Sequence, residues 1–167
     1  MDYCMFCGTR LHEKELEGEG MIPFCDKCNE FRFPVFNTAV SMIVTNESKD
    51  RIMLIKQYGR DRFILVAGYV NKGEDAEDAV KREIMEELGL KVKSMSFNHS
   101  RYFKPSNTLM LNFTAVVDEG EPKPNNEVDH YEWFSPDEAR ENIYKGSLAE
   151  SFLLGYLDGK YNFKTYD

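Results

Sequence analysis

The segment from Gly68 to Leu90 reads GYVNKGEDAEDAVKREIMEELGL, and it carries more information than any other part of this 167-residue chain. Its second half predicts a helix from Asp75 to Leu88, because Asp75 suits the N-cap and Gly89 suits the stop. An apolar residue recurs at every fourth position, which gives this helix a stripe that packs against a core: Ala76, Val80, Ile84 and Leu88. The segment therefore predicts a loop followed by an amphipathic helix.

Three glutamates of this helix, Glu83, Glu86 and Glu87, lie at positions i, i+3 and i+4, so their carboxylates share one side. One explanation is a solvated face with ordinary charge pairs, for example with Arg82. That explanation does not account for Glu87, which projects within the apolar stripe, because burying an unpaired carboxylate costs several kcal/mol. A hard cation with oxygen ligands removes this cost, so the pattern predicts a site for Mg²⁺ or Mn²⁺.

The wider spacing of this segment resembles a known family signature. It reads Gly68-x5-Glu74-x7-Arg82-Glu83-Ile84-x-Glu86-Glu87-x-Gly89-Leu90. Every specified position agrees with the Nudix box, G-x5-E-x7-R-E-U-x-E-E-x-G-U, in which U is aliphatic. The sequence is similar to Nudix hydrolases over residues 35–167. The resemblance implies an α/β (α+β) Nudix fold, a mixed β-sheet sandwiched between helices, with the box forming loop, helix and loop.

The resemblance also assigns roles to individual residues. The three helix glutamates would bind Mg²⁺ or Mn²⁺, Arg82 would orient them, and Glu74 would support the arrangement. Gly68 would let the loop turn where the phosphates approach. In many members a glutamate from a later loop joins the metals or acts as the base, and Glu127 occupies that place; an exposed loop acid is the alternative. The full catalytic set is Glu74, Arg82, Glu83, Glu86, Glu87 and Glu127. The identity of the general base stays open.

All four cysteines fall near the N-terminus, as Cys4-x2-Cys7, then 17 residues, then Cys25-x2-Cys28. Two close thiol pairs joined by a short loop can surround one ion tetrahedrally, as structural Zn²⁺ requires. Disulfides fit poorly with a chain that lacks a secretion signal, and a redox CxxC usually occurs once, beside a βαβ unit. We therefore expect a small zinc ribbon over residues 1–31, with His12 as a ligand that the site does not need.

The remaining chain alternates strand and helix signals. Strands are expected at 40–45, 52–57, 63–66, 91–97, 109–117 and 130–134, and further helices begin at Ser135 and at Ser147. Mixed strands with helices before and after them predict a layered α/β or α+β domain.

A zinc ribbon ahead of a Nudix box resembles the NADH pyrophosphatase branch, which cleaves NADH or NAD into nicotinamide mononucleotide and AMP and can act on NAD-capped RNA. That branch carries S-Q-P-W-P-F-P-x-S-L-M after the box, and residues 100–110 read SRYFKPSNTLM here. The serine, leucine and methionine at the ends agree, Thr108 replaces the last serine, and the glutamine and prolines are replaced. Side chains of this segment are candidates for stacking on a base or meeting a phosphate, or else are strand-end core: Arg101, Tyr102, Phe103 and Lys104.

Charge and composition narrow the class of partner. The net charge of −8 disfavours bulk electrostatic binding of nucleic acid or anionic membrane, although bound metal ions can reverse the local sign for a small phosphorylated substrate. The N-terminus lacks a basic signal region and the apolar runs are too short to span a bilayer, so we expect a cytoplasmic protein. The resembling branch is typically dimeric, which implies a homodimer.

Three functions remain open at this point. The first is an NAD(H) diphosphatase. The second is a Nudix hydrolase of another nucleotide, such as ADP-ribose, a nucleoside triphosphate or a dinucleoside polyphosphate. The third is a non-catalytic module that binds through the zinc ribbon, which would not need the complete set of box glutamates.

Overall fold

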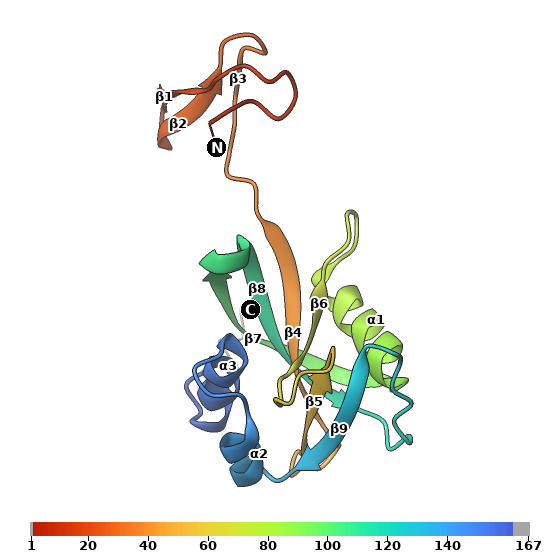
Figure 1. Ribbon diagram of the computed structural model, residues 1–167. Helices are drawn as coiled ribbons and strands as arrows, with labels where there is room; N and C mark the ends of the chain where they lie inside the picture. The colour runs from red at the N-terminus through yellow and green to blue at the C-terminus, as the bar shows by residue number, and fades with distance from the viewer. Residues whose placement is uncertain (1, 162–167) are drawn as a thin grey trace. The chain divides into compact units, whose positions relative to one another are not determined.

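A computed structural model describes residues 2–161 of the chain (Figure 1). The fold consists of two compact units, Met1–Phe36 and Asn37–Asp167. Among residues 2–161, each unit has its own sheet.

The first unit is a small antiparallel sheet with the order β1-β2-β3, formed by β1 (His12–Leu16), β2 (Gly20–Cys25) and β3 (Glu30–Phe31). Its buried ring is Phe24, which meets Phe31 edge to face at 4.9 Å and carries the Lys14 ammonium over its face at 3.8 Å. So small a unit buries little apolar surface, which leaves the cysteine cluster to supply much of its stability.

The second unit is built on one mixed sheet. The strand order is β7-β8-β4-β5-β9, and β6 pairs with β4 outside this path. The pairing of β4 with β8 is parallel, and the other pairings are antiparallel. The strands are β4 (Asn37–Thr45), β5 (Ile52–Gln57), β6 (Val66–Tyr69), β7 (Val92–Phe103), β8 (Thr108–Val117) and β9 (Val128–Phe134).

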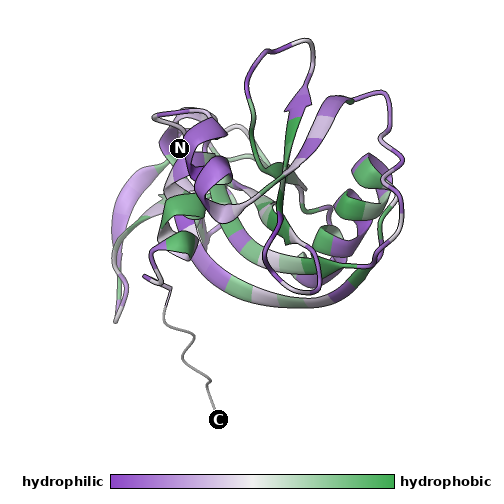
Figure 2. Cartoon of the chain, turned by 90° about the horizontal axis from the view of Figure 1, so that it is seen from below, coloured by the Kyte–Doolittle hydropathy of each residue, from purple (hydrophilic) through white to green (hydrophobic). Residues whose placement is uncertain are grey.

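Helices cover both faces of this sheet, and hydrophobic segments of helix and strand are visible in Figure 2. Successive strand residues point to opposite faces, so Val40 and Met42 of β4 face α1 (Ala76–Leu88), whereas Ile43 faces α2 (Pro136–Asn142) and α3 (Leu148–Leu157). The mixed sheet between helices confirms the expected fold class. Within the described residues, no helix has both the length and the apolar composition needed to cross a bilayer.

Local expectations were met unevenly. The helix α1 ends as predicted at Gly89, whose φ of 67° places it in the left-handed region. Asp75 is the N-cap residue, but its side chain makes no capping hydrogen bond. The strand predicted at 63–66 was wrong in its position: Phe63 and Ile64 make only isolated bridges, and the strand β6 begins at Val66. The strand β7 continues to Phe103, beyond the predicted end, because its antiparallel pairing with β8 runs as far as Phe103 and Thr108.

Candidate active site

A cleft of about 480 Å³ in the second unit gathers the predicted metal ligands Glu83, Glu86, Glu87 and Glu127, whereas Glu74 does not line it. The helix α1 supplies its glutamates and arginine to one wall, β6 supplies the adjoining wall, and the loop before β9 adds Glu127. Ala39, Thr108 and Met110, from the paired strands β4 and β8, also line it. Residues from distant parts of the sequence therefore meet at one acidic cleft.

Arg82 is the centre of the charge arrangement. Its Nε and Nη2 bind the two oxygens of Glu74 at 2.7 and 2.9 Å, and its Nη1 binds Glu83 at 2.7 Å and Glu86 at 3.2 Å. Nη2 also donates to the carbonyl oxygen of Tyr69 at 2.9 Å. The hydrogen bonds from Arg82 lower the pKa of Glu74 to about 2, which keeps that carboxylate ionised and the clamp intact.

Glu87 is the buried member of the cluster, with 3% of its surface exposed. Nε2 of Gln57 donates to its Oε2 at 2.8 Å. Burial, followed by the nearby negative charge of Glu83, raises the pKa of Glu87 to about 8. An ionised carboxylate at this place needs a cation beside it, and a set of carboxylate oxygens is the donor set that Mg²⁺ or Mn²⁺ prefers. The residues present therefore fit a divalent cation.

A first prediction follows from this burial. A divalent cation that binds only the folded state at 100 times its Kd stabilises it by about 2.7 kcal/mol, or about 5–11 °C in Tm for a chain of this size. We expect Mn²⁺ to raise the Tm of the wild type by this amount and that of Glu87→Gln by far less. Glu77→Gln, an exposed change on the same helix, is the matched control. Equal shifts in all three proteins would contradict a site built on Glu87.

Gly68 lies directly against the carboxylate of Glu83. A Cβ atom added to Gly68 would be 1.9 Å from Cδ of Glu83 and 2.0 Å from its Oε1. Gly68 also lies inside β6, where it pairs with Val40, rather than in a turn. Gly68 was expected to let the loop turn. Its role in the structure is different: the absence of a side chain leaves room for the carboxylate of Glu83.

We expect Gly68→Ala to reduce turnover by about 100-fold or more while the fold persists. The atoms nearest to the added methyl belong to the carboxylate of Glu83, the far end of a flexible side chain, which must move away from its position beside Arg82. A misplacement of about 1 Å in an active site can cost 100-fold in rate. Initial rates and a melting curve test this together. Gly120→Ala, at a loop glycine whose nearest contact would be 3.3 Å, is the control. Unchanged turnover in Gly68→Ala would show that the position of Glu83 is not critical.

Three further residues of this region, Gln57, Tyr58 and Asn125, match no motif in the sequence. Besides Gln57, the hydroxyl of Tyr58 donates to Oε2 of Glu127 at 2.8 Å. Asn125 lines the cleft, its Oδ1 accepts from the backbone N–H of Glu127 at 2.9 Å, and its own N–H donates to the carbonyl of Glu87. A polar residue closing an apolar strand, as Gln57 does, was the only local sign.

Of the residues predicted to contact substrate, Gly68 lines the acidic cleft, and the four from Arg101 to Lys104 lie elsewhere. Arg101 and Phe103 line a second cavity of about 380 Å³ beside α3, where Nη1 of Arg101 donates to the hydroxyl of Ser151 at 2.8 Å. The hydroxyl of Tyr102 donates to Oδ1 of Asn107 at 2.7 Å, and Lys104 begins a short 3-10 turn that ends at Ser106. Among these four residues, none lines the acidic cleft. Their contact with substrate stays a prediction.

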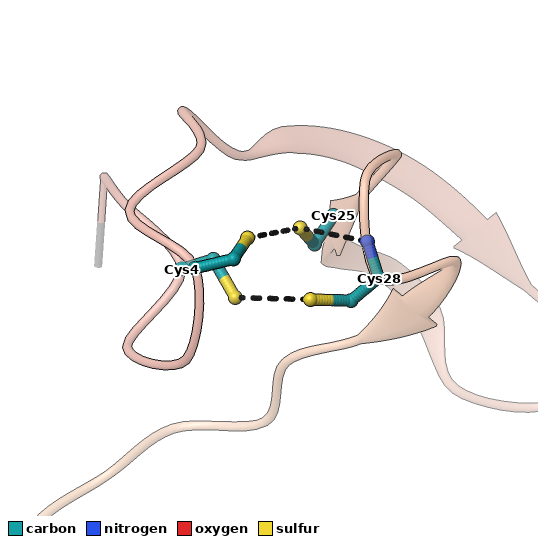
Figure 3. Close-up of side chains that lie close together, drawn as sticks. Cys4, Cys25 and Cys28 are labelled. Carbon is teal, nitrogen blue, oxygen red and sulfur yellow. Dashed lines mark hydrogen bonds between the residues drawn. The ribbon is translucent and has the colours of Figure 1, made fainter.

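The four cysteines form a second candidate site, in the first unit. The Sγ atoms of Cys4 and Cys28 are 3.9 Å apart, those of Cys7 and Cys25 are 3.5 Å apart, and all four lie within 4.8 Å of one another. Figure 3 shows the labelled side chains pointing toward a common centre. Four sulfurs at about 2.3 Å from one tetrahedral Zn²⁺ lie about 3.8 Å apart, whereas a disulfide requires about 2.05 Å. The spacing therefore fits a bound ion.

The surroundings of this cluster also suit an anionic metal centre. Arg32, of which 8% is exposed, donates through Nε to Sγ of Cys4 at 3.3 Å, and its charge compensates thiolates. His12 instead binds Oδ1 of Asp26 at 3.0 Å through Nε2. The cluster is thus formed by the cysteines alone among the described residues.

The sequence of this chain is similar to those of several known proteins. The NAD-capped RNA hydrolase NudC of Pseudomonas syringae pv. syringae is 27% identical over 156 residues, which make up 93% of this chain and 55% of that protein. The protein of the same name from Salmonella paratyphi B is 35% identical over 122 residues, 71% of this chain and 45% of the relative. The chain thus spans about half the length of the curated relatives it matches.

Solved structures show the same fold. A NUDIX hydrolase from Nitrosomonas europaea superposes with a TM-score of 0.67 at 20% identity, covering 96% of this chain and 92% of that one. A NUDIX-family hydrolase from Clostridium perfringens gives 0.60 at 18% identity, covering 75% and 96%. The NUDIX domain model matches residues 35–152, which include the whole acidic cleft. This chain therefore belongs to the Nudix family.

Proposed function

We propose that the chain is a divalent-metal-dependent hydrolase of phosphoanhydride bonds in nucleotides. The observation that carries this proposal is the buried carboxylate of Glu87, surrounded by Glu83, Glu86 and Glu127 in an open cleft. Such an arrangement destabilises a metal-free fold and is useful only if a cation and an anionic ligand occupy the cleft. Membership of the Nudix family also supports a metal-dependent hydrolase.

The residues of the cleft have distinct tasks in this proposal. Glu83, Glu86, Glu87 and Glu127 would hold Mg²⁺ or Mn²⁺, which supplies neutralisation of phosphate oxygens and a lowered pKa for a coordinated water. Arg82 keeps the carboxylates oriented through its hydrogen bonds, with Glu74 fixing the guanidinium. In the reaction a water oxygen bonds to phosphorus, the bridging P–O bond breaks, and the water proton passes to a carboxylate of the cleft.

We infer that the substrate is NAD or NADH, cleaved to nicotinamide mononucleotide and AMP. Relatives named NAD-capped RNA hydrolases support this, and so do Thr108 and Met110, which line the cleft at the positions of the serine and methionine in the pattern of that branch. One observation favours another nucleotide instead. The replaced part of that pattern, Arg101 to Lys104, lies away from the glutamates. NAD-capped RNA is a further substrate to examine.

We propose that Cys4, Cys7, Cys25 and Cys28 hold one structural Zn²⁺. Four thiolates close the coordination sphere, so this ion has no open position for a reacting water. The spacing of the sulfurs and the neighbouring Arg32 support the assignment. A ribbon that only binds a partner would not require the complete glutamate cluster of the second unit, which argues against a non-catalytic role.

Product analysis by chromatography tests the proposed substrate. The protein with Mg²⁺ or Mn²⁺ is offered NADH, NAD, NAD-capped RNA, ADP-ribose and a panel of nucleoside triphosphates, with Glu86→Gln as the blank. We expect AMP and nicotinamide mononucleotide from NADH and NAD, released by the wild type alone. Preferential cleavage of another nucleotide would replace the substrate but keep the enzyme class. Silence across the whole panel would contradict catalysis.

A further inference from the structure

Two consecutive side chains at the end of β5, the buried Gln57 and Tyr58 directly after the strand, contact glutamates of the acidic cleft. Gln57 donates to Glu87 and Tyr58 donates to Glu127, each at 2.8 Å. Successive residues of a regular strand point to opposite faces of the sheet. The backbone must therefore depart from a regular strand to bring both donors to the same side.

Tyr58 itself provides this departure. Its φ is 55°, in the left-handed region, and the pairing of β5 with β9 shifts register between Lys56 and Gln57. A left-handed backbone costs an ordinary residue about 1–2 kcal/mol, and it is rare for a bulky one. Tyr58 is 64% exposed, so burial of its ring does not offset this cost. The turn itself requires this φ: the backbone N–H of Arg60 donates to the carbonyl of Gln57 at 3.1 Å, and the next residue, Gly59, has a φ of 66°. The contact of the Tyr58 hydroxyl with Glu127, rather than the backbone strain, therefore indicates a role at the cleft.

The turn at Tyr58 and Gly59 is hydrogen-bonded to the segment that carries Glu127. The backbone N–H of Tyr58 donates to the carbonyl of Glu127 at 3.4 Å, and the hydroxyl binds the carboxylate of the same residue. The next N–H, that of Gly59, donates to Oδ2 of Asp129 at 2.6 Å. Main chain and side chain thus fix Glu127 and the start of β9 at neighbouring points.

Glu127 needs such a restraint because of its charge. It is exposed in a loop, and it faces the like charges of the helix glutamates across the cleft. Without a donor, repulsion and hydration favour a carboxylate that turns out into solvent. A neutral phenol hydroxyl opposes this movement without neutralising the charge that a cation requires.

We propose that Tyr58 is a positioning residue, whose left-handed backbone and hydroxyl hold the Glu127 carboxylate in place beside Glu83, Glu86 and Glu87 for a shared divalent cation. The proposal rests on the proposed metal-dependent function. It adds to that function a residue that lies outside the Nudix box and that no motif in the sequence marks.

Binding of Mn²⁺ alone, measured by electron paramagnetic resonance, tests the role without any substrate. Tyr58→Phe removes only the hydroxyl, and we expect it to weaken Mn²⁺ binding about 10-fold, within the 10–100-fold effect of partners that orient metal ligands. Glu127→Gln should weaken binding at least as much. The double variant should be no worse than Glu127→Gln, because the hydroxyl acts only through that carboxylate. Tyr144→Phe, at an exposed tyrosine outside the cleft, should bind as the wild type does.

A second variant separates positioning from support of the fold. Asparagine tolerates the left-handed region, so Tyr58→Asn should keep or raise the Tm and still weaken Mn²⁺ binding as Tyr58→Phe does. Additive losses in the double variant, or wild-type affinity in Tyr58→Phe, would overturn the proposal. A lowered Tm with unchanged Mn²⁺ binding in Tyr58→Asn would overturn it as well. Absence of Mn²⁺ binding in the wild type would instead show that the proposed function itself fails.

Discussion

Replacing Glu86 or Glu83 by glutamine is expected to lower kcat by about 1,000-fold, with the fold intact. Both residues lie on α1 in the acidic cleft, and both are bound by Nη1 of Arg82. Glutamine keeps the size of the side chain but removes one of the negative charges that would hold the cation, and a bound cation of this kind lowers the activation barrier by several kcal/mol. A loss of about 4 kcal/mol corresponds to about 1,000-fold in rate.

Single-turnover and steady-state rates with a nucleotide substrate, together with a melting curve, measure this effect. The Glu86 side chain is 56% exposed, so the change to glutamine should hardly alter stability. Glu77→Gln on the same helix controls for the loss of one negative charge on α1 and should keep the wild-type rate. Near-normal turnover in both Glu83→Gln and Glu86→Gln would remove the basis for the proposed chemistry.

Local spacing explains which features the sequence could predict. The helix α1 and its glutamates come from one continuous segment, so the period of the helix alone places Glu87 in the buried stripe. The cysteine cluster likewise follows from two close pairs and a short loop. In both cases the residues that meet are neighbours in the sequence or are separated by one hairpin.

The features that the sequence did not predict depend on distant pairing. Gln57 and Tyr58 reach Glu87 and Glu127 because β5 pairs with β9 and because a register shift and a left-handed residue reorient the strand end. The secondary-structure propensities of single residues predict neither the register of strand pairing nor a left-handed φ at a tyrosine. The segment from Arg101 to Lys104 was expected at the substrate, yet its position follows from the pairing of β7 with β8, which extends to Phe103.

A different loss is expected in the first unit when Cys4 and Cys7 are both replaced by serine. The variant should retain no Zn²⁺, and residues 2–36 should lose their protection from hydrogen exchange. Structural Zn²⁺ contributes about 10–16 kcal/mol of binding free energy in small zinc modules, more than a short three-stranded sheet can supply by burial. Arg32 would also lose the thiolate of Cys4 as an acceptor.

The second unit should remain folded in this variant, because its two hydrophobic clusters are formed by its own residues. Metal analysis after gel filtration and hydrogen exchange resolved by peptide measure both outcomes in one sample. His12→Ala is the control, since His12 pairs with Asp26 and stands apart from the four thiols, so that variant should keep one Zn²⁺ per chain. One tightly held Zn²⁺ in the double serine variant would refute the four-cysteine site. Loss of exchange protection throughout β4 to β9 would show that the second unit depends on the first for its stability.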